Sequence, residues 1–211
     1  MKVVEIFNSI EGEGKRAGIP CTFIRLHGCN LNCTYCDSRY AWQEENFTVM
    51  SVEEILDSVK RIGCPNITIT GGEPLFHEGV DLLIRSLRAE MYEVNVETNG
   101  SIVPHNYGSR VFFTVDYKTN ASGMSDKMNE EAFKVLKDTD VIKCVVGSWQ
   151  DMEQSLNFIE RFTRPSVYIS PVFGKIEPEE IVRFIKFHKL WNWHVQVQLH
   201  KIIWNPEERG V

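Results

Sequence analysis

Three cysteines within eight residues constrain this chain more than any other feature. Cys29, Cys33 and Cys36 stand at spacings of four and three residues, so one loop can wrap three thiols around a single inorganic centre. A structural zinc site takes four protein ligands, whereas a 4Fe-4S cluster held by three cysteines keeps one iron free for a ligand that is not protein. The triplet therefore indicates an open iron-sulfur cluster. The alternative is a zinc site completed by His27 or a distant cysteine.

The size and charge of the chain narrow the possibilities further. Its 211 residues are expected to form one domain over 1–211, large enough to bury about 70% of the unfolded surface. The net charge of -6 argues against general nucleic-acid binding and favours a small-molecule ligand. Early charges and the lack of a long apolar run predict a cytoplasmic protein with neither a signal peptide nor a membrane span.

The other cysteines do not extend the cluster motif. Cys21, Cys64 and Cys144 are scattered singly among apolar residues, which is typical of buried free thiols in a reducing compartment. We therefore expect neither a second cluster nor a disulfide.

Apolar segments of strand and helix type alternate along the rest of the chain, and Ser51 with Glu54 forms a capping-box pattern before one of the helices. Such βα units predict an α/β fold with parallel strands and right-handed crossovers. About six units are too few for a full eight-fold barrel. Strands are expected at 3–7, 21–28, 66–70, 92–97, 111–115, 140–146, 166–170 and 195–199, and helices at 51–61, 77–88, 129–136, 150–162 and 178–190.

Several expected strands end in polar or glycine motifs, and binding sites gather at that end of parallel strands. The motifs are Gly71-Gly72-Glu73-Pro74, Glu97-Thr98-Asn99-Gly100 and Asp116-Tyr117-Lys118. Each one alone also fits an ordinary βα turn.

Two features before the cysteines fit a ligand site as well. The turn Glu11-Gly12-Glu13-Gly14 carries two carboxylates, and Arg25 lies in the strand that leads to the cysteine loop. A guanidinium there can clamp a planar carboxylate through two hydrogen bonds. The alternative is a salt bridge from Arg25 to Glu11 or Glu13.

The spacing of the triplet, with Tyr35 before its last cysteine, resembles the signature of radical S-adenosylmethionine (SAM) enzymes. In that superfamily the open iron binds SAM, and one electron from the cluster yields a radical that abstracts hydrogen from the substrate. The full set of motifs, with Gln198-Leu199-His200-Lys201 near the end, is similar to the 7-carboxy-7-deazaguanine synthases. That resemblance implies an abbreviated, TIM-like partial barrel of about six parallel strands. It also implies conversion of 6-carboxy-5,6,7,8-tetrahydropterin to 7-carboxy-7-deazaguanine by ring contraction with loss of ammonia.

The resemblance further implies cofactors, partners and residue roles. The cofactors are a 4Fe-4S cluster, SAM and Mg²⁺, and the partners are an electron donor such as flavodoxin and a second subunit in a homodimer. The cysteine triplet would hold the cluster, and Ser38 would bind Mg²⁺. SAM would contact Tyr35, Gly72, Glu73, Glu97, Asp116, Tyr117, Lys118, Ser170, Pro171 and Val172, and the pterin would contact Ile10, Glu11, Gly12, Arg25, Thr70 and Val211.

Three positions depart from the family pattern. Many members have Ser-Pro-Lys where this chain has Asp116-Tyr117-Lys118, and Thr where it has Ser38. Gln is common at the position of Glu11, and an acid there would favour donor groups such as the pterin amine. Two other functions remain open at this stage: a glycyl-radical activating enzyme, similar in cluster spacing, and a non-enzymatic zinc-binding module.

Overall fold

The computed structural model describes residues 1–206 and 208–211. In these residues, nine strands form one sheet in the order β3-β1-β2-β4-β5-β6-β7-β8-β9. The first hairpin and β3 are antiparallel, and every later pair, from β2 with β4 to β8 with β9, is parallel. The strands are β1 (Lys2–Ile10), β2 (Pro20–Leu26), β3 (Thr48–Val49), β4 (Asn66–Gly71), β5 (Glu93–Thr98), β6 (Val111–Tyr117), β7 (Val141–Val146), β8 (Ser166–Pro171) and β9 (Trp193–Val195).

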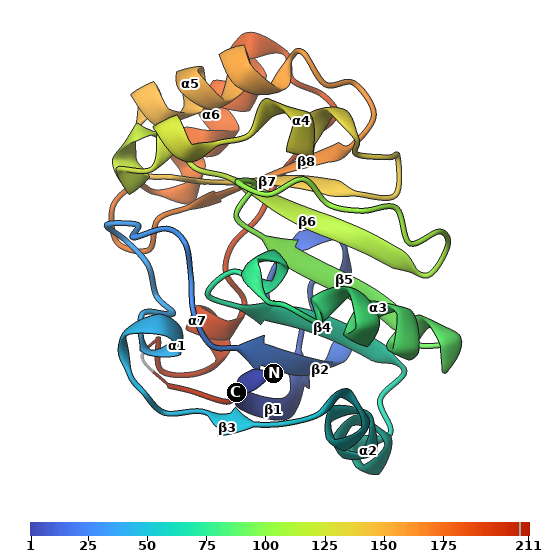
Figure 1. The fold of residues 1–211 in the computed structure, drawn as a ribbon. Coiled ribbons are helices and arrows are strands. Elements are labelled where there is room, and N and C mark those ends of the chain that lie inside the picture. Colours follow the sequence, from blue (N-terminus) through green and yellow to red (C-terminus); the bar gives the residue numbers. More distant parts are fainter. Residues whose placement is uncertain (207) are drawn as a thin grey trace.

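The main helices cover one side of this curved sheet (Figure 1), while the cysteine loop, α1 and α7 lie toward the other side. This arrangement is a partial, TIM-like α/β barrel, as predicted. The helices are α1 (Tyr40–Gln43), α2 (Val52–Ile62), α3 (Val80–Ala89), α4 (Glu130–Lys134), α5 (Trp149–Ile159), α6 (Pro178–His188) and α7 (His200–Ile203).

Alternation along the parallel strands gives the sheet two different faces. Residues such as Ile69, Val96 and Cys144 join the apolar core beneath the helices. The residues between them point to the opposite, inner face, because successive side chains of a strand alternate. The inner positions of the parallel strands carry a concentration of polar groups: Arg25, Thr68, Thr70, Asn95, Glu97, Thr114, Asp116, Lys143 and Ser170.

Most predicted elements are confirmed within a few residues. The capping box at α2 forms as expected, with Ser51 and Glu54 exchanging hydrogen bonds. The helix predicted from residue 77 begins only at Val80, since Pro74–Phe76 forms a 3-10 turn and Gly79 precedes the helix in a left-handed conformation. Among the described residues, no helix is long and apolar enough to cross a membrane.

The prediction of a final strand at 195–199 is wrong. β9 covers Trp193–Val195, and the chain leaves the sheet after Gln196, which still donates its backbone N–H to Ile169 of β8 at 2.9 Å. Gln196 exchanges two hydrogen bonds with the backbone of Gly14, at 2.7 and 3.1 Å, and Gln198 reaches Glu13 at 3.4 Å. These contacts hold the segment against the β1–β2 turn, so its alternating apolar pattern does not extend the sheet.

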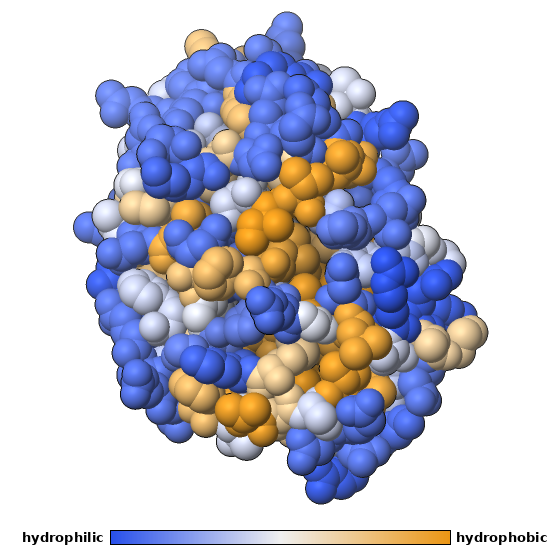
Figure 2. Space-filling model, viewed as in Figure 1, coloured by the Kyte–Doolittle hydropathy of each residue, from blue (hydrophilic) through white to orange (hydrophobic). Residues whose placement is uncertain are grey.

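Figure 2 shows the molecule from the same side as Figure 1. Apolar residues form a band through the middle of this face, and hydrophilic residues surround the band. Exposed apolar side chains elsewhere in the chain include Phe187 and Trp191, at the end of α6 and just after it.

Candidate active site

The cysteine loop follows β2 and is braced by the turn after β4. Gly72 donates its backbone N–H to Leu26, and Glu73 donates to Gly28. A Cβ atom on Gly72 would lie 2.1 Å from the Gly28 oxygen and 2.7 Å from the Cβ of Cys29. Glycine is therefore required at this position, because only a residue without a side chain lets the turn approach the loop so closely.

Two thiols of the triplet have raised pKa values. Burial raises the pKa of Cys29 and of Cys33, and each of these two is raised further by the charge of Cys36. Asn99 directs its amide toward the Cys29 sulfur at 3.8 Å. Among the described residues, however, no three His, Cys, Asp or Glu side chains are gathered in the arrangement of a metal-ion site.

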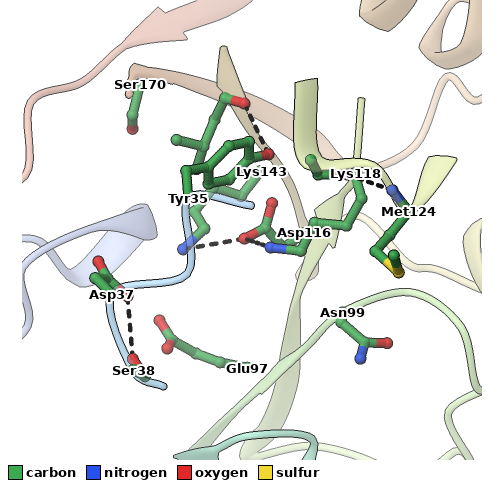
Figure 3. A network of polar contacts seen from close by, with 12 residues as sticks. Tyr35, Asp37, Ser38, Glu97, Asn99, Asp116, Lys118, Met124, Lys143 and Ser170 are labelled. Carbon is green, nitrogen blue, oxygen red and sulfur yellow. Dashed lines mark hydrogen bonds and ion pairs between the residues drawn. The ribbon is translucent and has the colours of Figure 1, made fainter. Parts of the chain in front are cut away.

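A chain of alternating charges crosses the inner face of the sheet (Figure 3). The Asp116 carboxylate pairs with Lys118 at 2.8 Å and lies 3.6 Å from Lys143. Lys143 also pairs with Glu13 at 3.1 Å, and Glu13 accepts a hydrogen bond from Ser170 at 3.1 Å. We call the series Lys118, Asp116, Lys143 and Glu13 the charge chain.

Burial makes the charge chain a fixed structure rather than a set of surface pairs. Lys143 is 7% exposed and Glu13 8%. Burial alone would lower the pKa of Lys143, but Glu13 and Asp116 hold it well above its ordinary value. Burial would likewise raise the pKa of Glu13, but Lys143 holds it below its ordinary value. Both groups therefore stay charged at neutral pH.

A second row of polar groups crosses β2, β4 and β5. Arg25 lies beside Thr70 in the parallel register, and the Thr70 hydroxyl donates to Glu97 at 3.0 Å. The Nε atom of Arg25 donates to Glu5 at 2.7 Å, and Tyr40 donates to the same oxygen at 3.0 Å. The salt-bridge partner of Arg25 is thus Glu5, not Glu11 or Glu13.

Glu73 is fully buried and already engaged within the protein. Its carboxylate accepts hydrogen bonds from the backbone of Leu75 at 2.9 Å, the Thr98 hydroxyl at 2.7 Å and the backbone of Asn99 at 2.7 Å. Burial raises its pKa. Glu73 therefore ties the turn after β4 to the end of β5.

Other predicted site residues fall on both faces of the sheet. Tyr35 donates its hydroxyl to the Val145 carbonyl at 3.3 Å, and Ser38 donates to Asp37 at 3.0 Å. Tyr117 stacks on Phe158 in the core, with ring centroids 4.2 Å apart, so only its backbone faces the strand end. Pro171 and Val172 continue the pairing of β8 with β7.

The C-terminal segment folds back onto the turn at residues 11–14. Leu199 donates its backbone N–H to Gly12 at 3.2 Å. A Cβ atom on Gly12 would lie 2.2 Å from the Nδ1 atom of His200, so any larger residue there would displace the His200 ring. Farther on, Arg209 pairs with Glu44 at 3.1 Å and lies over the Tyr40 ring. Two other predicted site residues, Ile10 just before the turn at residues 11–14 and Val211 in the C-terminal segment, are each half-buried.

Four residues of this region were not predicted as site residues: Lys143, Glu13, Asn99 and Gln198. Lys143 had a usable signal, because it interrupts an apolar strand in phase with the inner positions. Glu13, Asn99 and Gln198 stand in three of the predicted motifs, but their partners lie in distant segments and cannot be predicted from local pattern.

Comparisons with known proteins agree with this geometry. A family model described as the radical SAM superfamily matches residues 23–188. A protein of Clostridium acetobutylicum named 7-carboxy-7-deazaguanine synthase is 45% identical, covering 100% of this chain and 99% of its own length. A protein of the same name from Chlorobaculum tepidum is 35% identical, covering 100% and 97%. The crystal structure of QueE from Escherichia coli has a TM-score of 0.77 at 23% identity, covering 94% of both chains, and so shares the fold.

The chain therefore belongs to the radical SAM superfamily, whose members use a 4Fe-4S cluster and SAM. Neither a zinc-binding module nor a glycyl-radical activating enzyme is favoured by these matches. Within the superfamily, the chain is a member of the 7-carboxy-7-deazaguanine synthase family.

Proposed function

We propose that this chain converts 6-carboxy-5,6,7,8-tetrahydropterin to 7-carboxy-7-deazaguanine. The observation that carries the proposal is the polar inner face, which lies beside the three-cysteine loop in a chain that matches the family over its full length. When bound, the cluster and SAM supply an organic radical that removes a hydrogen atom from the substrate.

The residues fit the cofactors chemically. Cys29, Cys33 and Cys36 supply three thiolates from one loop, which leaves one iron for SAM. Gly72 keeps the neighbouring turn close to that loop. Asp116 and Lys118 at the end of β6, and Ser170 on β8, offer charged and hydroxyl groups for the polar parts of SAM. Glu73 acts through the turn that it anchors, because its carboxylate already accepts three hydrogen bonds.

Arg25 and Glu97 suit the two polar parts of the pterin. The hydrogen bond to Glu5 uses the Nε atom of Arg25, so its terminal nitrogens can bind the substrate carboxylate in parallel. Thr70 and Glu97 follow in the same row, where they can meet ring donors. Gly12 and Ile10 bring backbone groups, and Val211 is proposed to contact the pterin as well.

We further propose Mg²⁺ at Ser38, since hydroxyl and carboxylate oxygens are the ligands that this ion prefers and the Ser38 hydroxyl lies 3.0 Å from a carboxylate oxygen of Asp37. Lys201 pairs with the other oxygen of Asp37 at 2.9 Å and would compete with the ion. The finer expectations stay proposals too: a single domain, a cytoplasmic location, a flavodoxin-type electron donor and a homodimer.

The decisive test is turnover. Anaerobically reconstituted enzyme, given SAM and a strong reductant, should convert 6-carboxytetrahydropterin to a product with the mass of 7-carboxy-7-deazaguanine. Cleavage of SAM without that product, whatever the reductant, would leave a radical SAM enzyme with a different substrate.

A further inference from the structure

One amide side chain at the end of β5 is buried against the first cysteine of the triplet. Asn99 follows the last residue of β5 and is 7% exposed. Its Nδ2 atom lies 3.8 Å from the Sγ atom of Cys29, as a donor to that sulfur. The backbone N–H of Leu31 donates to the same sulfur at 3.4 Å. In the described part of the chain, the sulfurs of Cys33 and Cys36 accept no hydrogen bond, so Cys29 differs from both.

The orientation of the Asn99 amide follows from its neighbours. The oxygen and the nitrogen of an amide are told apart by the hydrogen bonds around them. The backbone N–H of Ser101 can only donate, and it points to the Oδ1 atom of Asn99 at 3.0 Å. The Ser101 hydroxyl donates to the same oxygen at 2.6 Å. Oδ1 therefore faces Ser101, and Nδ2 is the atom that faces Cys29.

The two hydrogens on Nδ2 of Asn99 have one acceptor each. The first goes to the Oδ1 atom of Asn30 at 2.9 Å, which leaves the second for the Cys29 sulfur. The Asn30 amide is fixed as well, because it donates to the Ser101 hydroxyl at 2.8 Å while the proton of that hydroxyl is used on Asn99. The three side chains form a closed ring of donors and acceptors, and the ring turns one N–H of Asn99 toward the cysteine.

Glu73 holds the two partners together. Its backbone N–H donates at 2.9 Å to the carbonyl of Gly28, the residue before Cys29. Its carboxylate accepts the backbone N–H of Asn99 at 2.7 Å. The backbones beside the sulfur and beside the amide are thus tied to one fully buried residue. The contact between Asn99 and Cys29 is therefore built into the fold.

We infer that Asn99 donates a hydrogen bond to the Cys29 sulfur when the cluster is bound, and that this bond raises the reduction potential of the cluster. One electron from an external reductant makes the cluster more negative, and part of that charge resides on its sulfur ligands. An N–H donor binds an acceptor more strongly when the acceptor is negatively charged, and hydrogen bonds to the sulfurs help to set the potential of such clusters. Asn99 therefore favours the reduced form. This inference rests on membership of the radical SAM superfamily and is independent of the pterin as substrate.

A reductive titration of reconstituted enzyme, without SAM or pterin, measures the potential through the electron paramagnetic resonance signal of the reduced cluster. Asn99→Leu removes the donor and keeps a side chain of similar size. At a fixed applied potential, the ratio of reduced to oxidised cluster should fall about three- to tenfold, the equilibrium effect of one hydrogen bond. A tenfold fall corresponds to a shift of about 59 mV for one electron. An unchanged potential in Asn99→Leu would overturn the inference.

Asn30→Ala is the matched control, because it separates a hydrogen bond to the cluster from a purely structural role. It removes the other acceptor of the Asn99 amide, while the Ser101 backbone still fixes Oδ1 and so keeps the N–H on Cys29. The potential should stay at the wild-type value or rise. If Asn99 acted only by tying the loop through Asn30, both variants would lower the potential equally, and that result would refute the inference.

A second variant decides the case in which Asn99→Leu takes up no cluster. Asn99→Asp keeps the oxygen that Ser101 holds but places an acceptor where the donor was. In neutral buffer it should lower the potential at least as far as the loss of the donor alone. A potential equal to that of the wild type would contradict the assignment.

The cleavage of SAM in the absence of pterin gives the consequence for the reaction. A strong reductant reduces most of the cluster in both proteins, whereas a weak one leaves the variant with the smaller reduced fraction. The ratio of the wild-type rate to the Asn99→Leu rate should therefore be larger with the weak reductant. Equal ratios with the two reductants would mean that the variant disturbs the SAM site instead, and the role of Asn99 in reduction would be wrong.

Discussion

The cysteine loop and the polar inner face of the sheet, which we propose as the two walls of one site, are held in different ways. The inner face is fixed by buried ion pairs, in which Lys143 bridges Asp116 and Glu13. The loop is held at its start by the turn at Gly72 and Glu73, and farther on by Arg39, which donates to the carbonyls of Cys33 and Thr34, while its thiols have few partners among the described residues. The difference indicates that the protein prepares the wall for the organic ligands, and that the cluster itself organises the thiols.

The largest effect is expected on the loop. Cys29→Ala, Cys33→Ala or Cys36→Ala should abolish SAM cleavage, because two thiolates cannot hold a cubane in one orientation. The free energy of unfolding of the cluster-free protein should change little. Iron content and urea unfolding measure the two quantities. Cys64→Ala is the matched control and should keep four irons per chain, and loss of iron from it would refute the ligand assignment.

The inner face should respond in the opposite way. Lys143→Met leaves Glu13 buried without its cation, and this should cost about 3–5 kcal/mol in the free energy of unfolding. Glu13→Gln in the same chain should recover part of the loss. Lys186→Met, at an exposed position, is the control. If Lys143→Met were as stable as the control, the charge chain would not fix this wall.

The pH dependence of that loss has a definite sign. The folded-state pKa of Glu13 is below its ordinary value, so its stabilising contribution is present above the ordinary pKa of a glutamate. The contribution should fade as the pH falls through the lower, folded-state value. The difference in unfolding free energy between wild type and Lys143→Met should therefore shrink in acid.

Arg25 lies where the row of polar groups starts, so its effect should be smaller and confined to substrate. Arg25→Lys should keep SAM cleavage in the absence of pterin, yet raise the Michaelis constant for the pterin. A lysine cannot form two parallel hydrogen bonds to a carboxylate, and the loss should be about 1.5–3 kcal/mol. Unchanged turnover at subsaturating pterin would rule out the assigned role.

The smallest effect is expected from the tail. A C-terminal tag, or deletion of residues 209–211, should weaken pterin binding severalfold and leave iron content and SAM cleavage intact. The tail reaches the neighbourhood of Arg25 in the structure: Arg209 pairs with Glu44 and lies over the Tyr40 ring, and Arg25 lies over the same ring. Identical pterin dependence with and without a tag would mean that Val211 has no part in the site.

Local sequence signals were enough for much of this architecture. The spacing of the triplet and the glycine pair at 71–72 located the cysteine loop and the turn that braces it, because both depend on covalent spacing and backbone freedom. The alternation of residues within each strand was also enough to predict the polar inner face. Thr68, Asn95 and Lys143 each interrupt an apolar run at a position that points to this face. We missed Lys143 because one charged residue in a strand is ambiguous until its neighbours are known.

Contacts between distant segments account for the rest. Nothing near Arg25 in the sequence distinguishes Glu5 from Glu11 or Glu13 as its partner, and only the register of β1 against β2 puts Glu5 opposite it. The surroundings of Glu11 likewise depend on β4 and β5, which supply Thr68 and Glu97. The expected strand at 195–199 does not form because the side-chain amide of Gln196 bonds to the backbone of Gly14 in the β1–β2 turn.

The union of the two chain ends has a consequence for how the molecule is made. Gln198 meets Glu13 across 185 residues, and Gln196 meets Gly14 across 182. The amino-terminal half of the chain is synthesised first. The turn at residues 11–14 therefore lacks its partners Gln196 and Gln198 until these residues have been synthesised. The parallel strands can assemble during synthesis, but the turn at residues 11–14 gains these contacts only after β9 has been made. A chain that ends before Gln196 would therefore leave the turn at residues 11–14 without these contacts.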